Sequence, residues 1–140
     1  ANAKMAYAAF EELFNQSRFQ ALKQGGAKPQ RLLWASTGTK SADYSDVLYL
    51  DELIGPSTVT TVPPATYVAF KNHGTVKSTL KTNMEGARKH LAELPQFSID
   101  LAKITVQLED EGVKTFAKAF DNLLAALSNK MRDMRSTVAA

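Results

Sequence analysis

The sequence contains no cysteine, which excludes disulfide bonds, thiolate nucleophiles and cysteine-ligated metal sites. It has only two histidines, which lie far apart and lack the spacing of a metal-ligand pair. No apolar stretch approaches the about 18 residues that a membrane-spanning helix needs, and the start of the chain has no secretory-signal pattern. We therefore expect a soluble chain with no structural metal and no membrane insertion.

The chain also has no concentrated charge of either sign. Its 17 Lys and Arg residues are scattered among 14 Asp and Glu residues, giving a net charge of +3. No basic block with interleaved aromatic residues occurs, so we expect no nucleic-acid partner. A length of 140 residues with 44% hydrophobic residues predicts one domain. The first residue is Ala1 and a helical pattern follows at once, so we expect the chain to begin inside a larger protein.

Apolar spacing predicts a helix over residues 2–24, broken near Ser17 and stopped by Gly25 and Gly26. The run of residues 32–35 is apolar on both faces, which is typical of a strand inside a parallel sheet. The β-branched run of residues 57–62 predicts a second short strand. Between the two strands, VLYLDELI predicts a short helix capped by Ser45 or Asp46.

The second half of the chain reads as helical. We expect a helix from Pro64 to about Phe70, and a Thr82–Glu85 capping box that opens a helix over residues 83–94. A further helix, capped by Ser98 or Asp100, is expected to be interrupted at Gly112. Beyond it lies one apolar stripe, which we interpret as core: Val113, Phe116, Phe120, Leu123, Leu124, Leu127, Met131 and Met134.

One candidate site follows the first strand, in RLLWASTGTK, residues 31–40. A parallel strand that ends in Ser36, Thr37 and Gly38 places hydroxyl and backbone N–H groups where α/β folds bind their ligands. Lys40 adds a positive charge, and this combination suits a phosphate. Composition alone favours an ordinary strand-to-loop junction, because the stretch lacks the glycine spacing of a P-loop.

Other chemically suggestive residues have simpler explanations. Asp51 and Glu52 are adjacent in a predicted helix, as are the acidic residues 109–111, and adjacent helical side chains do not converge on one reacting centre. We interpret them as solvated helix faces. His73, which precedes Gly74, is interpreted as part of a helix terminus and not as a catalytic base.

Residues 30–74, QRLLWASTGTKSADYSDVLYLDELIGPSTVTTVPPATYVAFKNHG, resemble the carboxyl-terminal part of transaldolases of the long bacterial and plastid-type branch. ANAKMAYAAFEELF and ITVQLEDEGVKTFAKAFDNLLAAL, on either side, are similar to the same branch. The resemblance implies an α/β fold: the carboxyl-terminal part of a (β/α)8 barrel, incomplete on its own. It also implies transfer of a dihydroxyacetone unit between sugar phosphates of the pentose phosphate pathway, through a lysine Schiff base and without a cofactor.

In this resemblance residues 31–37 correspond to strand seven and residues 57–62 to strand eight. Ser36 stands at the family's phosphate-contacting serine. Many members carry arginine two positions later, where this chain has Gly38, and we expect Lys40 to take that role across a longer loop. The implied phosphate site is therefore Ser36, Thr37 and Lys40. The stretches that carry the Schiff-base lysine and the catalytic aspartate and glutamate are absent, so residues 1–140, a single partial domain, should not be active alone.

Hydrogen bonding gives an independent reason to expect incompleteness. Two short parallel strands leave unpaired backbone groups at both edges, and each buried unpaired group costs about 1 to 3 kcal/mol. We expect the missing amino-terminal barrel portion, or another protein, to cover those edges. A third alternative is that the chain's own helices close over the strands as a helical mini-domain. The chain is then either part of an active transaldolase or a non-catalytic transaldolase-like subunit of a larger assembly. Cytoplasm and plastid stroma both fit its composition.

Overall fold

The computed structural model describes residues 1–138 and, of the side chains in the last helix, those up to residue 134. The chain divides into two compact units, Ala1–Glu93 and a second that begins at Leu94. The elements of the first unit are α1 (Asn2–Asn15), α2 (Ser17–Gln24), β1 (Leu32–Trp34), α3 (Leu48–Glu52), β2 (Thr58–Thr60), α4 (Pro64–His73) and α5 (Met84–Glu93). The second unit contains the 3-10 helix η1 (Leu94–Phe97) and α6 (Leu101–Val138). Among the described residues, no helix is long and apolar enough to cross a membrane.

The break between α1 and α2 lies at Gln16, whose backbone is extended with φ −62° and ψ 148°. This confirms the predicted break near Ser17. The Gln20 side chain donates a hydrogen bond of 2.8 Å to the carbonyl of Phe14, which supplies a partner for one of the carbonyls that a helix end leaves free. Phe14 and Phe19 then pack edge to face across the break, with ring centroids 4.7 Å apart.

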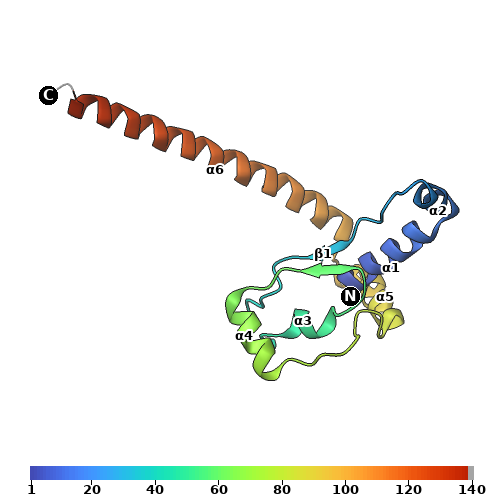
Figure 1. Cartoon of the computed structure of the whole chain (residues 1–140). Coiled ribbons are helices and arrows are strands. Elements are labelled where there is room, and N and C mark those ends of the chain that lie inside the picture. The colour runs from blue at the N-terminus through green and yellow to red at the C-terminus, as the bar shows by residue number, and fades with distance from the viewer. Residues whose placement is uncertain (139–140) are drawn as a thin grey trace. The chain divides into compact units, whose positions relative to one another are not determined.

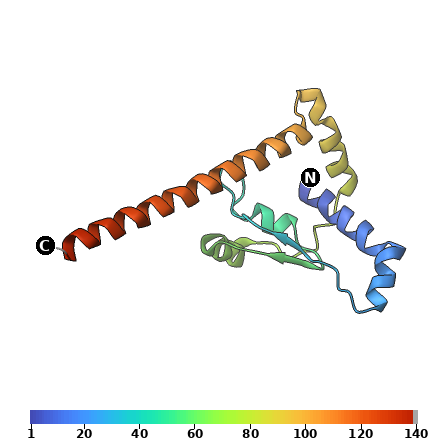
Figure 2. The same cartoon turned by 90° about the horizontal axis from the view of Figure 1, so that it is seen from above.

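Strands β1 and β2 form a parallel pair and lie side by side in both views (Figures 1 and 2). Leu33 stands opposite Val59 in this register. The sheet has only these two strands in the described part of the chain, so the outer edge of each lacks a strand partner. Parallel strands are normally buried on both faces. Here Trp34 is buried but Leu33 is 53% exposed, so one face of the predicted two-sided strand is uncovered.

The core of the first unit is small and lies where α1 meets β1. Tyr7, Trp34 and Leu80 form it, and four partly buried side chains pack around them: Ala3, Phe10, Leu32 and Leu53. Helix α1 also packs against α5. Burial of apolar surface contributes about 25 cal/mol per Å², so this cluster helps to hold α1 against the strand.

Polar contacts fix α1 as well. The Lys4 ammonium is nearly buried and donates to the Glu52 carboxylate at 3.0 Å and to the Thr82 carbonyl at 3.1 Å. The Tyr7 hydroxyl donates to the carbonyl of Pro56 at 3.2 Å. These bonds join α1 to three segments that lie far away in the sequence, and they satisfy polar groups whose burial would otherwise be costly.

Three predictions about helix ends were wrong. Neither Ser45 nor Asp46 caps α3, whose N-cap is Val47 and has no side-chain capping bond. Thr82 and Glu85 form no capping box: the Thr82 hydroxyl donates to the carbonyl of Thr79. The Asn83 side chain accepts the N–H of Gly86 instead, and α5 begins at Met84. Gly112 does not interrupt α6 either, because one glycine costs a helix only about 1 kcal/mol. The predicted cap at Asp100 is confirmed, since its carboxylate accepts the Lys103 N–H at 3.1 Å.

The apolar stripe of α6 was interpreted as core, and this was wrong for the structure as described. Its eight side chains, from Val113 to Met134, are between 47% and 81% exposed. A single helix has no second element against which to bury such a face. The stripe therefore remains an uncovered hydrophobic surface of the second unit.

Candidate functional site

Ser36 follows β1 directly, as the sequence predicts. Its backbone has φ 54°, in the left-handed region that costs a non-glycine residue energy. The side chain is exposed and has no hydrogen-bond partner within the described chain. A strained residue with a free hydroxyl at the carboxyl end of a strand is typical of ligand-binding loops.

Thr37 turns inward, unlike its neighbour. Only 2% of it is exposed, and its hydroxyl donates a hydrogen bond of 2.6 Å to the carbonyl of Thr61. The Thr61 N–H in turn donates to the carbonyl of Trp34 at 3.0 Å. The ends of the two strands are thus joined at one edge of the sheet. Because the Thr37 hydroxyl proton is engaged, this residue can offer a ligand only its backbone N–H.

Gly38 lies against the amino-terminal end of α4. A Cβ atom at this position would stand 3.3 Å from the Thr66 hydroxyl oxygen and 3.4 Å from Pro63. A larger side chain at position 38 would therefore press on the start of α4.

Lys40 is exposed on the loop between β1 and α3. It has no ion-pair partner among the side chains that the structure describes. Thr39, beside it, donates its hydroxyl to the carbonyl of Ser45 at 3.1 Å, which fixes the loop around the lysine. The structure thus separates the two side chains at the strand end, with Ser36 exposed and Thr37 buried, and leaves Lys40 as an unpaired cation on the same loop.

The other candidates make structural contacts, and the predicted place of His73 at a helix terminus is confirmed. Glu52 binds Lys4, and Asp51 accepts the backbone N–H of Thr75 at 2.8 Å, so these neighbouring carboxylates point to different partners. His73 is the last residue of α4 and pairs with Asp46 at 2.8 Å. Within the described residues, no group of three or more His, Cys, Asp or Glu side chains could hold a metal ion.

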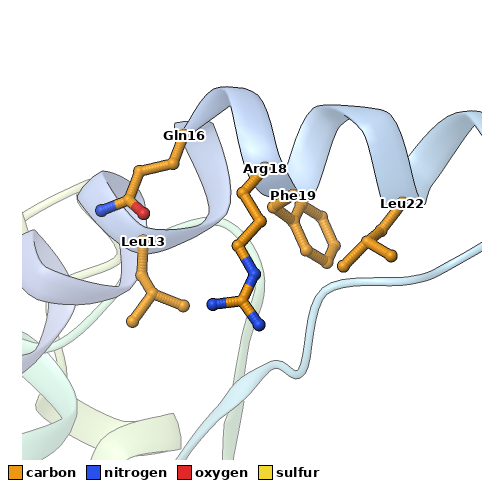
Figure 3. A pocket seen from close by; sticks show the side chains of 5 residues that line it. All are labelled: Leu13, Gln16, Arg18, Phe19 and Leu22. Carbon is orange, nitrogen blue, oxygen red and sulfur yellow. The ribbon is translucent and has the colours of Figure 1, made fainter.

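An apolar pocket of about 330 Å³ lies where α1 meets α2, remote in sequence from the 36–40 loop (Figure 3). It is lined by Leu13, Gln16, Arg18, Phe19 and Leu22. It contains one charged group, Arg18, and no acid or base that could work with it. The pocket is therefore a gap beside the helix break.

Comparison with known proteins settles the family. The model of the transaldolase/fructose-6-phosphate aldolase family matches residues 1–127. The chain belongs to this family. A transaldolase of Thermobifida fusca is 43% identical over 132 residues, 94% of this chain. A transaldolase of Neisseria gonorrhoeae is 47% identical over 125 residues, 89% of this chain. A third, of Trichodesmium erythraeum, is 43% identical over 136 residues, 96% of this chain.

These transaldolases are much longer than the chain. The matched region spans 36% of the length of each of the three. The resemblance drawn from W-A-S-T-G-T-K and its neighbours is thus confirmed at the level of the transaldolase family, and its partial extent fits the coverage.

Sequence reasoning missed two residues beside the loop, Thr61 and Thr66. Nothing in their local pattern marks them, because their role depends on which segments meet in space.

Proposed function

We propose that this chain is the phosphate-binding part of a transaldolase, a carboxyl-terminal segment of a (β/α)8 barrel. In the complete barrel it holds the phosphate of the sugar substrate while a dihydroxyacetone unit is transferred. The observation that carries the proposal is the 36–40 loop: an exposed, strained Ser36 and an unpaired Lys40 follow a parallel strand in a transaldolase-family chain.

Each group has a defined part in this proposal. The Ser36 hydroxyl and the Thr37 backbone N–H donate to phosphate oxygens, and the Lys40 ammonium neutralises their charge. Hydrogen bonds to charged groups contribute about 1.5 to 3 kcal/mol each. The Schiff-base lysine and its acid and base partners lie outside residues 1–140 in this proposal. The chain therefore contributes binding and orientation, and not the reacting amine.

The uncovered surfaces support a barrel context. Both outer strand edges lack strand partners in the described residues, and Leu33 is half exposed. The apolar stripe of α6 is uncovered as well. A complete barrel would pair the edges with neighbouring strands and leave no open edge. The alternative, a non-catalytic subunit of a larger assembly, would cover the same surfaces with a different protein.

Steady-state kinetics of the natural-length protein test the proposal. Lys40→Ala should raise KM for phosphorylated substrates about tenfold or more and change kcat little, because it removes a charge that binds the phosphate. Lys77→Ala is the matched control, since Lys77 is also exposed and unpaired but lies outside the loop. Equal kinetics of the two variants would remove Lys40 from the site.

Borohydride trapping separates the enzyme from the alternative. Incubated with a ketose phosphate and borohydride, the natural-length protein should gain the mass of a reduced Schiff-base adduct, located outside residues 1–140. The 140-residue chain should gain none. If the natural-length protein also fails to form the adduct and instead co-purifies with a second protein, the non-catalytic subunit is the correct reading.

A further inference from the structure

Thr66 is an unusual residue at the amino-terminal end of α4. It is only 7% exposed, yet its hydroxyl has no hydrogen-bond partner within the described residues. In that part of the chain, Trp34 Nε1 is the one fully buried side-chain nitrogen or oxygen without a partner. The Thr66 hydroxyl is therefore still reached by solvent. It is a free donor in a residue that is otherwise more than nine-tenths buried.

The position of this hydroxyl links it to the loop after β1. It lies 3.3 Å from where a Cβ atom on Gly38 would stand, so it faces the backbone of the 36–40 loop from the side of α4. No side chain stands between them, because residue 38 is glycine. The Thr66 hydroxyl therefore lies beside the middle residue of this loop.

The backbone around Thr66 also suits an anion. Helix α4 is ten residues long and begins with Pro64, which has no N–H. The Tyr67 N–H donates to the carbonyl of Pro63, and the N–H groups of Ala65 and Thr66 belong to the first turn, where helices leave donors free. The helix dipole adds a partial positive charge at this end.

We propose that Thr66 is a further phosphate ligand, whose hydroxyl and N–H complete the site formed by Ser36, Thr37 and Lys40. The ligand class is a phosphate monoester, bound between the loop after β1 and the first turn of α4. This inference rests on the proposed function. It adds that specificity for a phosphorylated sugar depends on a residue of α4, beyond β2, and not only on the loop.

The arrangement also gives a reason for Gly38. An arginine at this position would press on Pro63 and Thr66 and cover the start of α4. With glycine there, the end of the helix is open to the loop, and its neutral donors share the phosphate with Lys40. In the proposed site, the phosphate charge is therefore balanced by Lys40 and by the amino-terminal end of α4.

The test compares KM for an aldose phosphate with KM for the same aldose without phosphate, in the natural-length protein. Thr66→Val keeps the shape of the side chain and removes the hydroxyl. It should raise KM for the phosphorylated sugar about tenfold, leave KM for the free sugar unchanged and weaken competitive inhibition by inorganic phosphate by the same factor. Thr66→Ser, which keeps the hydroxyl, should recover most of the lost affinity.

The controls distinguish the possible failures. If Thr66→Val lowers the melting temperature, Thr66→Ala replaces it, because it removes the hydroxyl without adding atoms. If Ser36→Ala and Lys40→Ala weaken phosphate binding while both Thr66 variants bind normally, this inference is overturned and the proposed function stands. If none of these variants discriminates phosphorylated from free sugar, the phosphate site itself is wrong.

Discussion

The Thr37 hydroxyl donates a hydrogen bond of 2.6 Å to the carbonyl of Thr61, and this bond joins the segments that leave β1 and β2. Thr37→Val should lower the free energy of unfolding by about 0.5 to 1.5 kcal/mol, because it removes one hydrogen bond from the nearly fully buried Thr37 side chain. Urea unfolding measures the change. Thr37→Ser keeps the hydroxyl and should lose less than half as much. Equal losses of unfolding free energy in Thr37→Val and Thr37→Ser would show that the effect comes from packing and not from the hydrogen bond.

Two glycines should respond to alanine in opposite directions. At Gly55 a Cβ atom would stand 2.6 Å from Leu80 Cδ2 and 2.8 Å from Leu80 Cβ, and Leu80 is fully buried. Gly55→Ala should therefore cost about 1 to 3 kcal/mol, as overpacked cores do. At Gly112 nothing lies within 4 Å, so Gly112→Ala should stabilise α6 by about 0.5 to 1 kcal/mol.

Far-ultraviolet circular dichroism during thermal unfolding follows both glycine changes. The helical signal of Gly112→Ala should persist to a higher temperature than that of the unmodified chain, and that of Gly55→Ala should be lost earlier. A destabilised Gly112→Ala variant would show that position 112 contacts another part of the protein and is not free.

Trp34 is a core residue whose Nε1 hydrogen is buried without an acceptor in the described residues. An unpaired buried donor costs about 1 to 3 kcal/mol. Trp34→Phe removes this donor but leaves a smaller side chain, and the two effects oppose each other. We expect a change in unfolding free energy below about 1 kcal/mol, compared with about 2 to 5 kcal/mol lost in Leu80→Ala. A large loss in Trp34→Phe would indicate an acceptor for the indole.

The free energy of unfolding should fall above about pH 10, because Tyr7 of α1 loses its hydroxyl proton there. Burial, reinforced by the Glu11 charge, raises the pKa of Tyr7 above its ordinary value of 10.0. The unfolded chain then loses this proton at a lower pH than the folded one. The contribution of Tyr7 to the free energy of unfolding is fully present below pH 10.0. It is lost as the pH rises through the pKa of Tyr7 in the folded chain.

The pKa of Lys81 is raised as well, so Lys81 affects the pH dependence of stability in the same direction as Tyr7. Its hydrogen bond to Glu11 raises its pKa above the ordinary value of 10.5, so its contribution is also lost as the pH rises beyond that value. Lys81 is exposed, and exposed pairs contribute little. Unfolding free energy measured against pH should therefore fall less steeply above pH 10 in Tyr7→Phe than in the unmodified chain. Parallel curves would show that other groups cause the decline.

Much of the local structure could be predicted from the sequence. Pattern alone located the helix break near Ser17, both strands, and the cap at Asp100. It failed where several local signals competed: Asn83, and not Thr82, caps α5, and the propensity of 38 helical residues outweighs one glycine at position 112. Local preferences are decided by such differences of about 1 kcal/mol.

The site could be predicted only in part, for a different reason. Ser36 and Lys40 are recognisable because they follow a strand within one short motif. The inward turn of Thr37 and the approach of Thr66 to Gly38 depend on how distant segments pack. The burial of Lys4 was missed for the same reason, since its partners Glu52 and Thr82 lie far along the chain.

The open outer edges of β1 and β2 also bear on how the isolated chain behaves in concentrated solution. A strand edge with free backbone groups is a template on which another copy can add, and proteins usually guard such edges with charge, proline or a covering element. The exposed residue of β1 is Leu33, which is neither charged nor proline and is left 53% exposed. Self-association through the backbone should therefore compete with assembly of the proposed barrel, and aggregation should decrease when the strands proposed to neighbour β1 and β2 are co-expressed.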